Sequence, residues 1–534
     1  MIALRRGRAV RRPGLRRLAP LLAVLAGCAT AGPAAAPPAG PGPAPASPAP
    51  LAAYVLLSEA PDGAPVAFAR AIVGAGKPCP DLHGTGPQRR RTTAPLPMSK
   101  RANPHGFEVD VCEATVPFGA ALMLGEGGPA LPVARREVRR VAVVGDTGCK
   151  PKDQDGCGLD DPAWPFAALA SAAAARRPDL VLHVGDYNYR GTPSSFEREV
   201  GGEKVTTWYY DAGDGAPPAE RCGTPGPYYS QNSTGNPDAD RWEAWWLDLF
   251  QPAADLLAAA PWVFTRGHHE LCSHAGPGWF YFLDPSSALP EGGGEQLACP
   301  PQDGADGPAL PHLAFAPPRV VALDGVTVAA LDSANACDEL PNFTATYAGQ
   351  LAAVADRLDG SAAWLVGHRP VWGVEGTAEG PPYGCDGRPG TGAAQPYAAL
   401  NVTLQCALAG RVGAALLPRL DLVLSGHMHR FETLSFAAGS GRPPTLVVGN
   451  SGVLQDTAPP QGAFEQTVDG AEASGVSVEQ FGFVELDRGD RGAWRATVMA
   501  TDPGAWSPAV PPCPAPGGER PFLCVEGIAA RPGG

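Results

Sequence analysis

Five short motifs in this chain combine carboxylate, imidazole and phenol side chains that could bind metal ions. Each motif contains glycine and follows an apolar run, and together the motifs hold five of the ten histidines. Carboxylate and imidazole groups that converge on two ions about 3.5 to 4 Å apart form a two-metal catalytic site. The motifs are GDTG with Asp146, GDYNY with Asp186 and Tyr189, GHHE with His268 and His269, VGH with His368, and SGHMH with His427 and His429.

Each motif alone has an ordinary structural explanation. A Gly-Asp pair after a strand often forms a turn, in which the Asp side chain bonds its own backbone. A single His after a strand is more often a core or loop residue, and we interpret His183 in VLHVGD in this way. Tyr189 alone would be explained by packing. The joint occurrence of the five motifs at strand ends favours the two-metal site.

The elements that must position these motifs follow from the pattern of apolar runs after residue 138. Short runs rich in Val, Leu and Ala alternate with helical segments, which predicts an α/β fold with a mainly parallel core. Ligands of such sheets gather at the carboxyl ends of the strands. Expected strands lie in VRRVAVVGD, PDLVLHVGD, PWVFTRG, VTVAALDS, AWLVGH, LDLVLSGH and TLVVGN, and expected helices at 162–177, 346–360 and 397–420.

The N-terminus has the pattern of an export signal. Seven arginines precede a short apolar run and the sequence LAGC, which ends at Cys28. This arrangement resembles a bacterial lipobox, in which Cys28 is lipidated and becomes the first mature residue. The alternatives are a signal peptide cleaved elsewhere or an uncleaved anchor. We expect an exported protein that is anchored to the membrane by an N-terminal lipid, on the periplasmic side or at the cell surface.

Composition divides the rest of the chain. After a signal peptide at 1–27, a Pro- and Ala-rich linker at 28–50 has the composition of an extended tether. Short alternating runs predict a small β domain at 51–134. We expect the catalytic domain at 135–505 and a C-terminal tail with a disulfide at 506–534. No later apolar stretch has the length of a membrane span.

Charge limits the class of partner. The formal net charge of the whole chain is −13, and removal of the seven arginines at 1–27 takes it to about −20. Nucleic acid would be repelled by such a surface. A small anionic substrate is still possible where metal ions supply local positive charge.

Cysteine usage indicates an oxidising compartment. Apart from Cys28 there are twelve cysteines, none of them in a CxxC pair, which favours disulfides over a thiolate zinc site. Spacing suggests three pairs and leaves the others open. These pairs are Cys149 with Cys157, Cys513 with Cys524, and Cys79 with Cys112.

The ordered set GDxG, GDxxY, GxHE, a strand ending in His, and GHxH resembles the calcineurin-like metallophosphoesterases. It is most similar to the purple acid phosphatase type, in which Tyr in GDxxY accompanies the lack of a His in the first motif. The resemblance covers roughly residues 138 to 500. It implies an α/β/β/α sandwich with a small N-terminal β domain.

The resemblance also implies a role for each motif residue. Asp146, Asp186, Tyr189 and His429 would bind one metal ion. Asp186 would bridge to a second ion held by His368, His427 and position 268, where the family has Asn and this chain has His268. His269 would protonate the leaving group.

The cofactors implied are two metal ions. Phenolate is a hard ligand, so Tyr189 implies iron at the first position, while the second ion would be divalent Zn, Fe or Mn. A metal-bound hydroxide would then hydrolyse a small phosphate monoester. There are two alternatives. One is a phosphodiesterase that uses the same site, and the other is a degenerate metal-binding or surface-interaction protein in which His268 disrupts the site.

Overall fold

The computed structural model describes the chain from residue 50 to residue 527, with gaps. The described residues are 50–85, 95–151, 154, 157–190, 195–200, 203–208, 240–272, 274–285, 299, 314–358, 363–378, 383–388, 390, 395–490, 492–506, 510, 513 and 523–527. The expected signal peptide at 1–27, Cys28 and nearly all of the linker lie outside these residues. Among the helices that can be described, none has the length and apolar character needed to cross a membrane.

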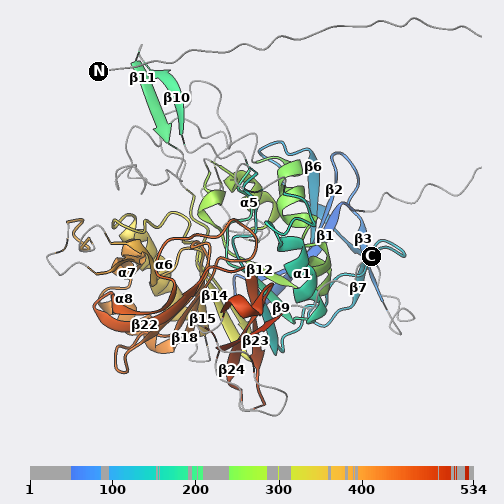
Figure 1. Ribbon diagram of the computed structural model, residues 1–534. Helices are drawn as coiled ribbons and strands as arrows, with labels where there is room; N and C mark the ends of the chain where they lie inside the picture. The colour runs from blue at the N-terminus through green and yellow to red at the C-terminus, as the bar shows by residue number, and fades with distance from the viewer. Residues whose placement is uncertain are drawn as a thin grey trace, which may run out of the picture. The chain divides into compact units, whose positions relative to one another are not determined.

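Two large β-sheets form the centre of the fold (Figure 1). The first has the order β25 (Leu523–Gly527), β24 (Trp494–Ala500), β23 (Gly482–Arg488), β8 (Arg140–Val144), β9 (Leu180–His183), β12 (Trp262–Phe264), β1 (Ala52–Glu59), β2 (Pro65–Gly74), β6 (Val109–Val116) and β5 (Ser99–Lys100). The second has the order β13 (Arg319–Leu323), β14 (Val326–Ala330), β15 (Ala363–Val366), β18 (Leu420–Ser425), β20 (Thr445–Val448), β19 (Phe431–Phe436), β22 (Ala471–Val478) and β21 (Gly462–Val468).

Smaller elements complete the described chain. Three small sheets are formed by β3 (Asp81–Gly84), β4 (Leu96–Pro97) and β7 (Leu122–Leu124), by β10 (Ser195–Val200) and β11 (Glu203–Trp208), and by β16 (Gly373–Thr377) and β17 (Tyr397–Leu400). The α-helices are α1 (Phe166–Ala175), α3 (Trp242–Trp245), α4 (Ala254–Ala259), α5 (Gly276–Phe282), α6 (Thr344–Arg357), α7 (Val402–Ala407) and α8 (Arg411–Leu416). Short π and 3-10 turns lie at Trp246–Phe250, His268–Glu270, Leu417–Arg419 and Pro503–Trp506.

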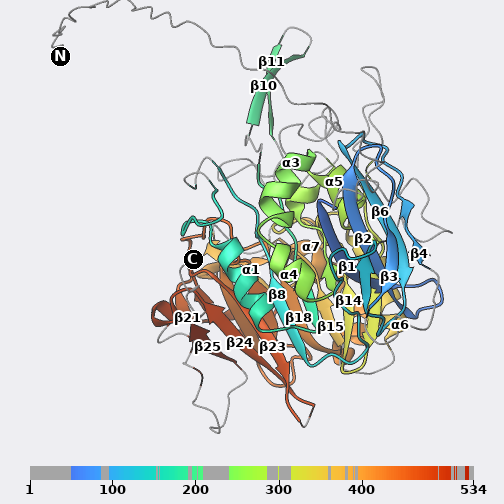
Figure 2. The same cartoon turned by 90° about the vertical axis from the view of Figure 1, so that its right-hand side faces the viewer.

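The main core lies between the two sheets. Val143 and Leu182 of the first sheet share one buried cluster with Val366 and Leu424 of the second. Helices cover the outer faces: α1, α4 and α5 pack on the first sheet, as Figure 2 shows for α1 and α4, and α6, α7 and α8 pack on the second. The expected mixed α/β fold with an N-terminal β region is confirmed.

All seven expected strands are present, as β8, β9, β12, β14, β15, β18 and β20. Strands β8, β9 and β12 pair in parallel in the first sheet, and β14, β15, β18 and β20 pair in parallel in the second. Because parallel neighbours end on the same edge, the motifs that follow the strands are collected at one edge of each sheet.

The N-terminal strands differ from the expected separate domain. Strand β1 pairs in parallel with β12, with Leu56 opposite Trp262, so β1, β2, β6 and β5 extend the first sheet, whereas β3, β4 and β7 form a small sheet of their own. Buried polar contacts explain the attachment. Arg70 donates to the carbonyl oxygens of Phe282 at 2.5 Å and Asp284 at 2.7 Å, and the Tyr54 hydroxyl donates to Phe282 at 2.6 Å. Such buried donors remain satisfied only while β1 and β2 stay on α5.

Two further expectations need correction. The segment 397–420, expected as one helix, consists of β17, α7, α8 and a 3-10 turn, because the Asn401 side chain caps α7 and Gly410 adopts a left-handed φ of 67° between α7 and α8. The C-terminal region is also more than a tail, since β25 pairs in parallel with β24.

Disulfides join several of these segments. The three suggested pairs, Cys79–Cys112, Cys149–Cys157 and Cys513–Cys524, are confirmed, and Cys272–Cys299 and Cys385–Cys406 are also present. Cys337 is disulfide-bonded as well. This usage is typical of an extracytoplasmic protein.

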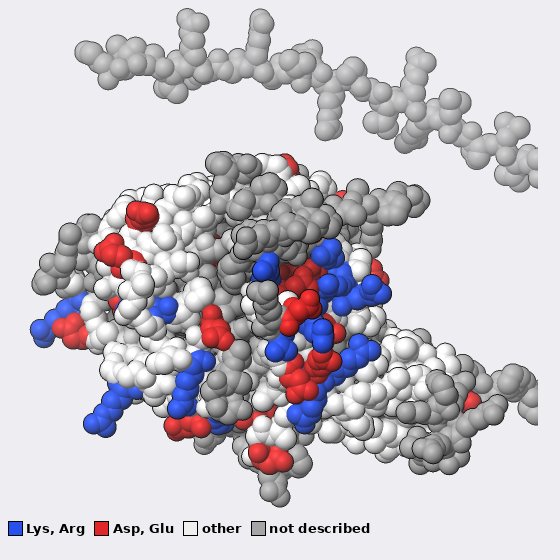
Figure 3. All heavy atoms as spheres, turned by 90° about the horizontal axis from the view of Figure 1, so that it is seen from below, with Lys and Arg blue, Asp and Glu red and all other residues white. Residues whose placement is uncertain are grey.

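Charged side chains are mixed on the face of the molecule shown in Figure 3. There, Lys and Arg lie interspersed with Asp and Glu and do not gather by sign. Ion pairs between described residues include Arg140 with Asp487 at 2.8 Å and Arg176 with Glu485 at 2.6 Å. The pair of Arg140 with Asp487 is partly exposed, and such pairs add little to stability, whereas the Glu485 carboxylate is buried.

One stability prediction arises from α6. Gly349 is exposed in this helix, and a Cβ atom there would meet no atom within 4 Å. We expect Gly349→Ala to raise the free energy of unfolding by about 0.5 to 1 kcal/mol, because Ala loses less backbone entropy on folding. Urea unfolding of both proteins measures the difference, and a lower unfolding midpoint for the variant would contradict it.

Candidate metal centre

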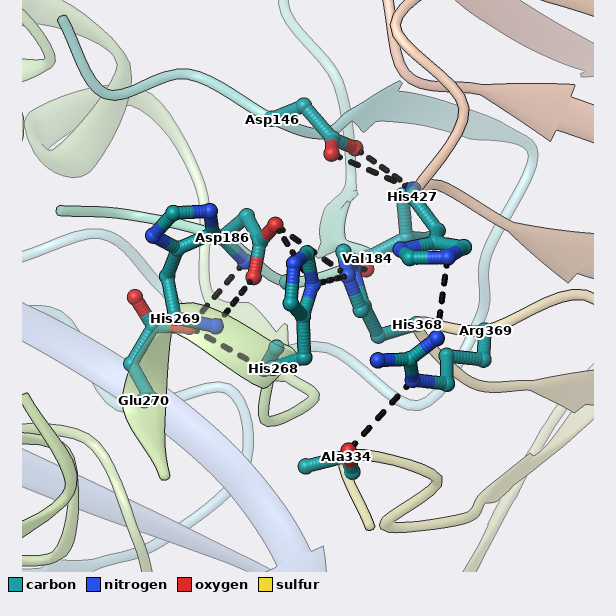
Figure 4. A network of polar contacts seen from close by, with 12 residues as sticks. Asp146, Val184, Asp186, His268, His269, Glu270, Ala334, His368, Arg369 and His427 are labelled. Atoms are coloured by element: carbon teal, nitrogen blue, oxygen red, sulfur yellow. Dashed lines mark hydrogen bonds and ion pairs between the residues drawn. The ribbon is translucent and has the colours of Figure 1, made fainter. Parts of the chain in front are cut away.

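Five parallel strands deliver the motif residues to one place. Asp146 follows β8, Asp186 follows β9, His268 follows β12, His368 follows β15 and His427 follows β18. The close-up in Figure 4 shows these five side chains converging from both sheets. Asp146, Asp186, His268 and His368 are buried and the His427 side chain is 13% exposed, so water competes weakly for any ion that they bind.

The backbone turns sharply where three of these residues leave their strands. Asp146, Asp186 and His427 have φ angles of 54°, 59° and 77°, in the left-handed region that non-glycine residues rarely adopt. Such a conformation costs on the order of 1 kcal/mol for each residue and persists where surrounding contacts enforce it. The turns aim the two carboxylates and the imidazole inward.

Glycines in two motifs allow the close approach of these loops. A Cβ on Gly267 would lie 2.0 Å from Oδ1 of Asp186, and a Cβ on Gly426 would lie 2.3 Å from Oδ2 of Asp146. Any side chain at either position would displace a carboxylate of the site. Gly in GHHE and in SGHMH is therefore required by space.

Glu270 ties the GHHE turn to the GDYNY turn. Its Oε1 accepts from the backbone N–H groups of Tyr187 at 2.9 Å and Asn188 at 3.2 Å, and its Oε2 accepts from those of Asp186 and Gly267, both at 3.1 Å. The carboxylate is fully buried, so loss of these bonds would leave several buried donors unsatisfied.

The first group of donors surrounds the Tyr189 hydroxyl. This oxygen lies 3.1 Å from Oδ1 of Asp146, 3.1 Å from Oδ2 of Asp186 and 3.1 Å from Nε2 of His429. The pKa of Tyr189 is raised well above its usual value, mainly by burial and then by the nearby carboxylates of Asp146 and Asp186. Three oxygens and one nitrogen thus meet within hydrogen-bond distance.

The second group consists of imidazoles around the same Asp186. Nδ1 of His268 lies 2.9 Å from Nε2 of His368 and 3.0 Å from Oδ2 of Asp186, and Nε2 of His368 lies 3.2 Å from that oxygen. His427 contributes the third ring of the group. Burial lowers the pKa of His427 to about 3, so its ring is a neutral imidazole.

His269 lies between the two groups and is anchored by its backbone. Its N–H donates to Oδ1 of Asp186 at 3.0 Å, and its carbonyl oxygen accepts from Nδ1 of His274 at 2.5 Å. Its ring centroid lies 4.0 Å from that of Tyr189 and 4.5 Å from that of His268. The ring therefore borders both donor groups.

The donor set fits metal ions. The Asp146 and Asp186 carboxylates are fully buried and each lies 3.1 Å from the Tyr189 hydroxyl. Burial and the neighbouring Asp186 therefore raise the pKa of Asp146 well above its usual value. A bound cation would relieve this repulsion. Nδ1 of His427 is a buried ring nitrogen that has no hydrogen-bond partner among the described residues, as expected for an atom that faces an ion. His, Asp and Tyr side chains are suitable ligands for Zn or Fe.

Partners outside the donor groups orient two of the rings. Nδ1 of His368 donates to the carbonyl oxygen of Val184 at 2.9 Å, which leaves the Nε2 lone pair directed at Asp186. His429 is held by Asp456, which accepts from its backbone N–H at 2.9 Å and lies 3.4 Å from its Nδ1. Outer partners of this kind fix ring orientation in metal sites.

The structure brings together every motif residue that the sequence indicated and keeps His183 apart. His183 bonds Thr147 at 2.9 Å and stacks on Tyr187, as expected for a core residue. Glu270, His274, Asp338 and Asp456 were missed as contributors. The E of GHHE was a local signal for Glu270, but the other three stand outside all five motifs.

Comparisons with known proteins identify the family of the chain. No curated protein matches the chain. Among solved structures it is similar to one described as the structure of PhoD, with 13% identity over 86% of this chain and 90% of that chain and a TM-score of 0.41. The model of the family described as calcineurin-like phosphoesterase matches residues 139–431, more than half of the chain and all five motifs. This chain belongs to the calcineurin-like phosphoesterase family and is a metal-dependent phosphoesterase.

Proposed function

We propose that this protein hydrolyses phosphate monoesters at a centre of two metal ions. The observation that carries the proposal is the position of Asp186. Its Oδ2 lies within 3.2 Å of donor atoms from both groups, namely Tyr189 in one and His268 and His368 in the other. A carboxylate shared in this way is suited to bridging two ions.

Each ion would have its own set of ligands. Asp146, Asp186, Tyr189 and His429 would hold the first ion, and Asp186, His268, His368 and His427 would hold the second. When bound, the ions would polarise the phosphoryl group and activate water for attack. His268 takes the place that Asn has in the family motif, and its Nδ1 is directed at the shared carboxylate.

The type of the centre follows from its ligands in this proposal. A phenolate from Tyr189 favours iron at the first position and places the protein with the purple acid phosphatase type. Three imidazoles at the second position favour Zn or Fe over Mn.

The chain's own contribution to the reaction would be a proton. The His269 ring borders both donor groups, where it would protonate the departing oxygen of the ester as a general acid. Its backbone bonds to Asp186 and His274 would hold the ring in place while the ester is cleaved.

The cellular setting of the proposal is outside the cytoplasm. The disulfides support export, and the LAGC sequence supports a lipid on Cys28 that would anchor the enzyme to a membrane. Release of a Cys28→Ser variant from membranes would test the anchor.

Metal analysis combined with two substrates tests the proposed activity. We expect two ions per chain, and faster hydrolysis of p-nitrophenyl phosphate than of bis(p-nitrophenyl) phosphate. Faster hydrolysis of the diester would show that the protein is a phosphodiesterase and not a monoesterase. Absence of metal would exclude both of these activities.

A spectroscopic prediction concerns Tyr189. If its phenolate binds Fe(III), the purified protein will absorb visible light by charge transfer, and Tyr189→Phe will remove this band. The variant lacks only the hydroxyl that lies 3.1 Å from Asp146 and Asp186. Visible spectra at equal iron content provide the measurement, and a band that persists in the variant would show that Tyr189 is not the ligand.

A further inference from the structure

Asp338 contacts the outer side of one imidazole of the site. It follows Cys337 in the loop after β14, and its side chain is 17% exposed. Its Oδ2 lies 2.9 Å from Nε2 of His427, although the two residues are 89 positions apart in the chain. The carboxylate thus meets the ring nitrogen on the side away from the donor group.

Two further residues hold the Asp338 carboxylate in place. Nδ2 of Asn401 donates to its Oδ1 at 2.6 Å, and the Arg369 guanidinium forms an ion pair with its Oδ2. The Asn401 amide nitrogen and the guanidinium both act as donors to this carboxylate, and a guanidinium can only donate. Asp338 is therefore a fixed acceptor of hydrogen bonds.

Arg369 also approaches the same nitrogen of His427. Its Nη1 lies 3.0 Å from Nε2, and Figure 4 shows this contact. A guanidinium can only donate, whereas a carboxylate can only accept. The two neighbours therefore favour opposite tautomers of the His427 ring.

The tautomer decides whether His427 can bind an ion. When Nε2–H donates to Asp338, Nδ1 keeps its lone pair, and this is the buried nitrogen for which the described part of the chain offers no hydrogen-bond partner. When Nε2 accepts from Arg369, the proton moves to Nδ1 and blocks it. A neutral imidazole carries only one ring proton.

We propose that Asp338 is a positioning residue that selects the metal-binding tautomer of His427 against the competing donor Arg369. This inference rests on the two-metal centre proposed above. Asp338 lies outside every motif, and it would affect binding of the second ion alone. The reason is that Asp338 contacts His427, which belongs to the imidazole group.

Calorimetric titration of the metal-free protein with Zn²⁺ tests the inference. We expect Asp338→Ala to weaken one of two binding steps by about 10- to 100-fold, the range for lost outer partners of metal-binding histidines, and to leave the other step unchanged. Asp421→Ala is the matched control, because Asp421 is an exposed carboxylate on β18, the strand that leads to His427. This control should bind as the native chain does.

Three variants distinguish tautomer selection from the simple loss of a negative charge. Arg369→Ala should keep both steps, since Asp338 still accepts from His427. The double variant Asp338→Ala/Arg369→Ala should bind more tightly than Asp338→Ala, because the competing donor is gone. Asp338→Asn should bind more tightly than Asp338→Ala, because its amide oxygen can still accept although the charge is lost.

The outcomes separate this inference from the proposed function. Fewer than two binding steps in the native chain would overturn the two-metal proposal itself. Two native steps that Asp338→Ala leaves unchanged would overturn the role of Asp338 alone. Equal weakening in Asp338→Asn and Asp338→Ala would mean that charge, and not tautomer selection, explains the effect.

Discussion

Asp186→Asn is expected to empty both proposed metal positions and to abolish phosphoesterase turnover, whereas Asp146→Asn should release only the first ion. Oδ2 of Asp186 lies 3.0 Å from His268 and 3.1 Å from Tyr189, so one oxygen serves both donor groups. Asn would replace an ionised carboxylate by a neutral amide. The amide has one oxygen that can accept, and its NH₂ group can only donate. The loss of turnover should exceed the roughly 100-fold caused by removing an outer partner.

Elemental analysis of the two variants beside the native protein provides the measurement. Circular dichroism is needed as a control, because both carboxylates are buried and Oδ1 of Asp186 also accepts from the backbone of His269. Equal metal losses in two folded variants would rule out a bridging role for Asp186.

The strands and the motif residues could be predicted because both leave local patterns. Val141 to Val144 form an apolar run that ends at Gly145 and Asp146, and the other four motifs repeat this arrangement. Parallel pairing collects the motifs at one edge of each sheet. Packing of the two sheets against each other then brings Asp146 of the first sheet to His427 of the second. The five motifs were sufficient to locate the site.

Long-range contacts could not be predicted, because they leave no periodic signal. The pairing of Leu56 with Trp262 joins segments about two hundred residues apart, and alternating runs alone do not reveal that β1 extends the sheet of the site. Asp338 likewise lies 89 residues from the His427 that it contacts. A single carboxylate after an apolar strand is an ordinary turn residue until the partner ring is placed beside it.

Local chemistry also limited the prediction. The segment 397–420 is rich in Ala and Leu, so its helical pattern continues across the break at Gly410, whose left-handed φ ends one helix before the next begins. Glu270 was visible in the GHHE motif, but its four backbone bonds depend on the positions of Asp186 and Gly267 in two different loops. Sequence shows which residues are available, and tertiary contacts decide what they do.

Substitutions of the adjacent residues His268 and His269 are expected to have different effects on metal content and turnover. They occupy one 3-10 turn, and their rings lie at 63° to each other. Nδ1 of His268 is directed at Asp186 and His368, whereas the His269 ring lies against Tyr189. This difference in position underlies the proposal that His268 binds an ion and His269 protonates the leaving group.

His269→Ala should keep both ions and lower turnover by about 10²- to 10⁴-fold, the contribution of a general acid. The loss should be smallest for p-nitrophenyl phosphate, whose leaving group departs without a proton. His268→Ala should instead lose the second ion, and His268→Asn should retain it, because the amide oxygen can occupy a position close to that of Nδ1. Metal content measured beside turnover for all three variants decides the assignment. Two ions and full activity in His268→Ala would show that His268 is not a metal ligand. An inactive native chain that becomes active in His268→Asn would identify this protein as a degenerate member of its family.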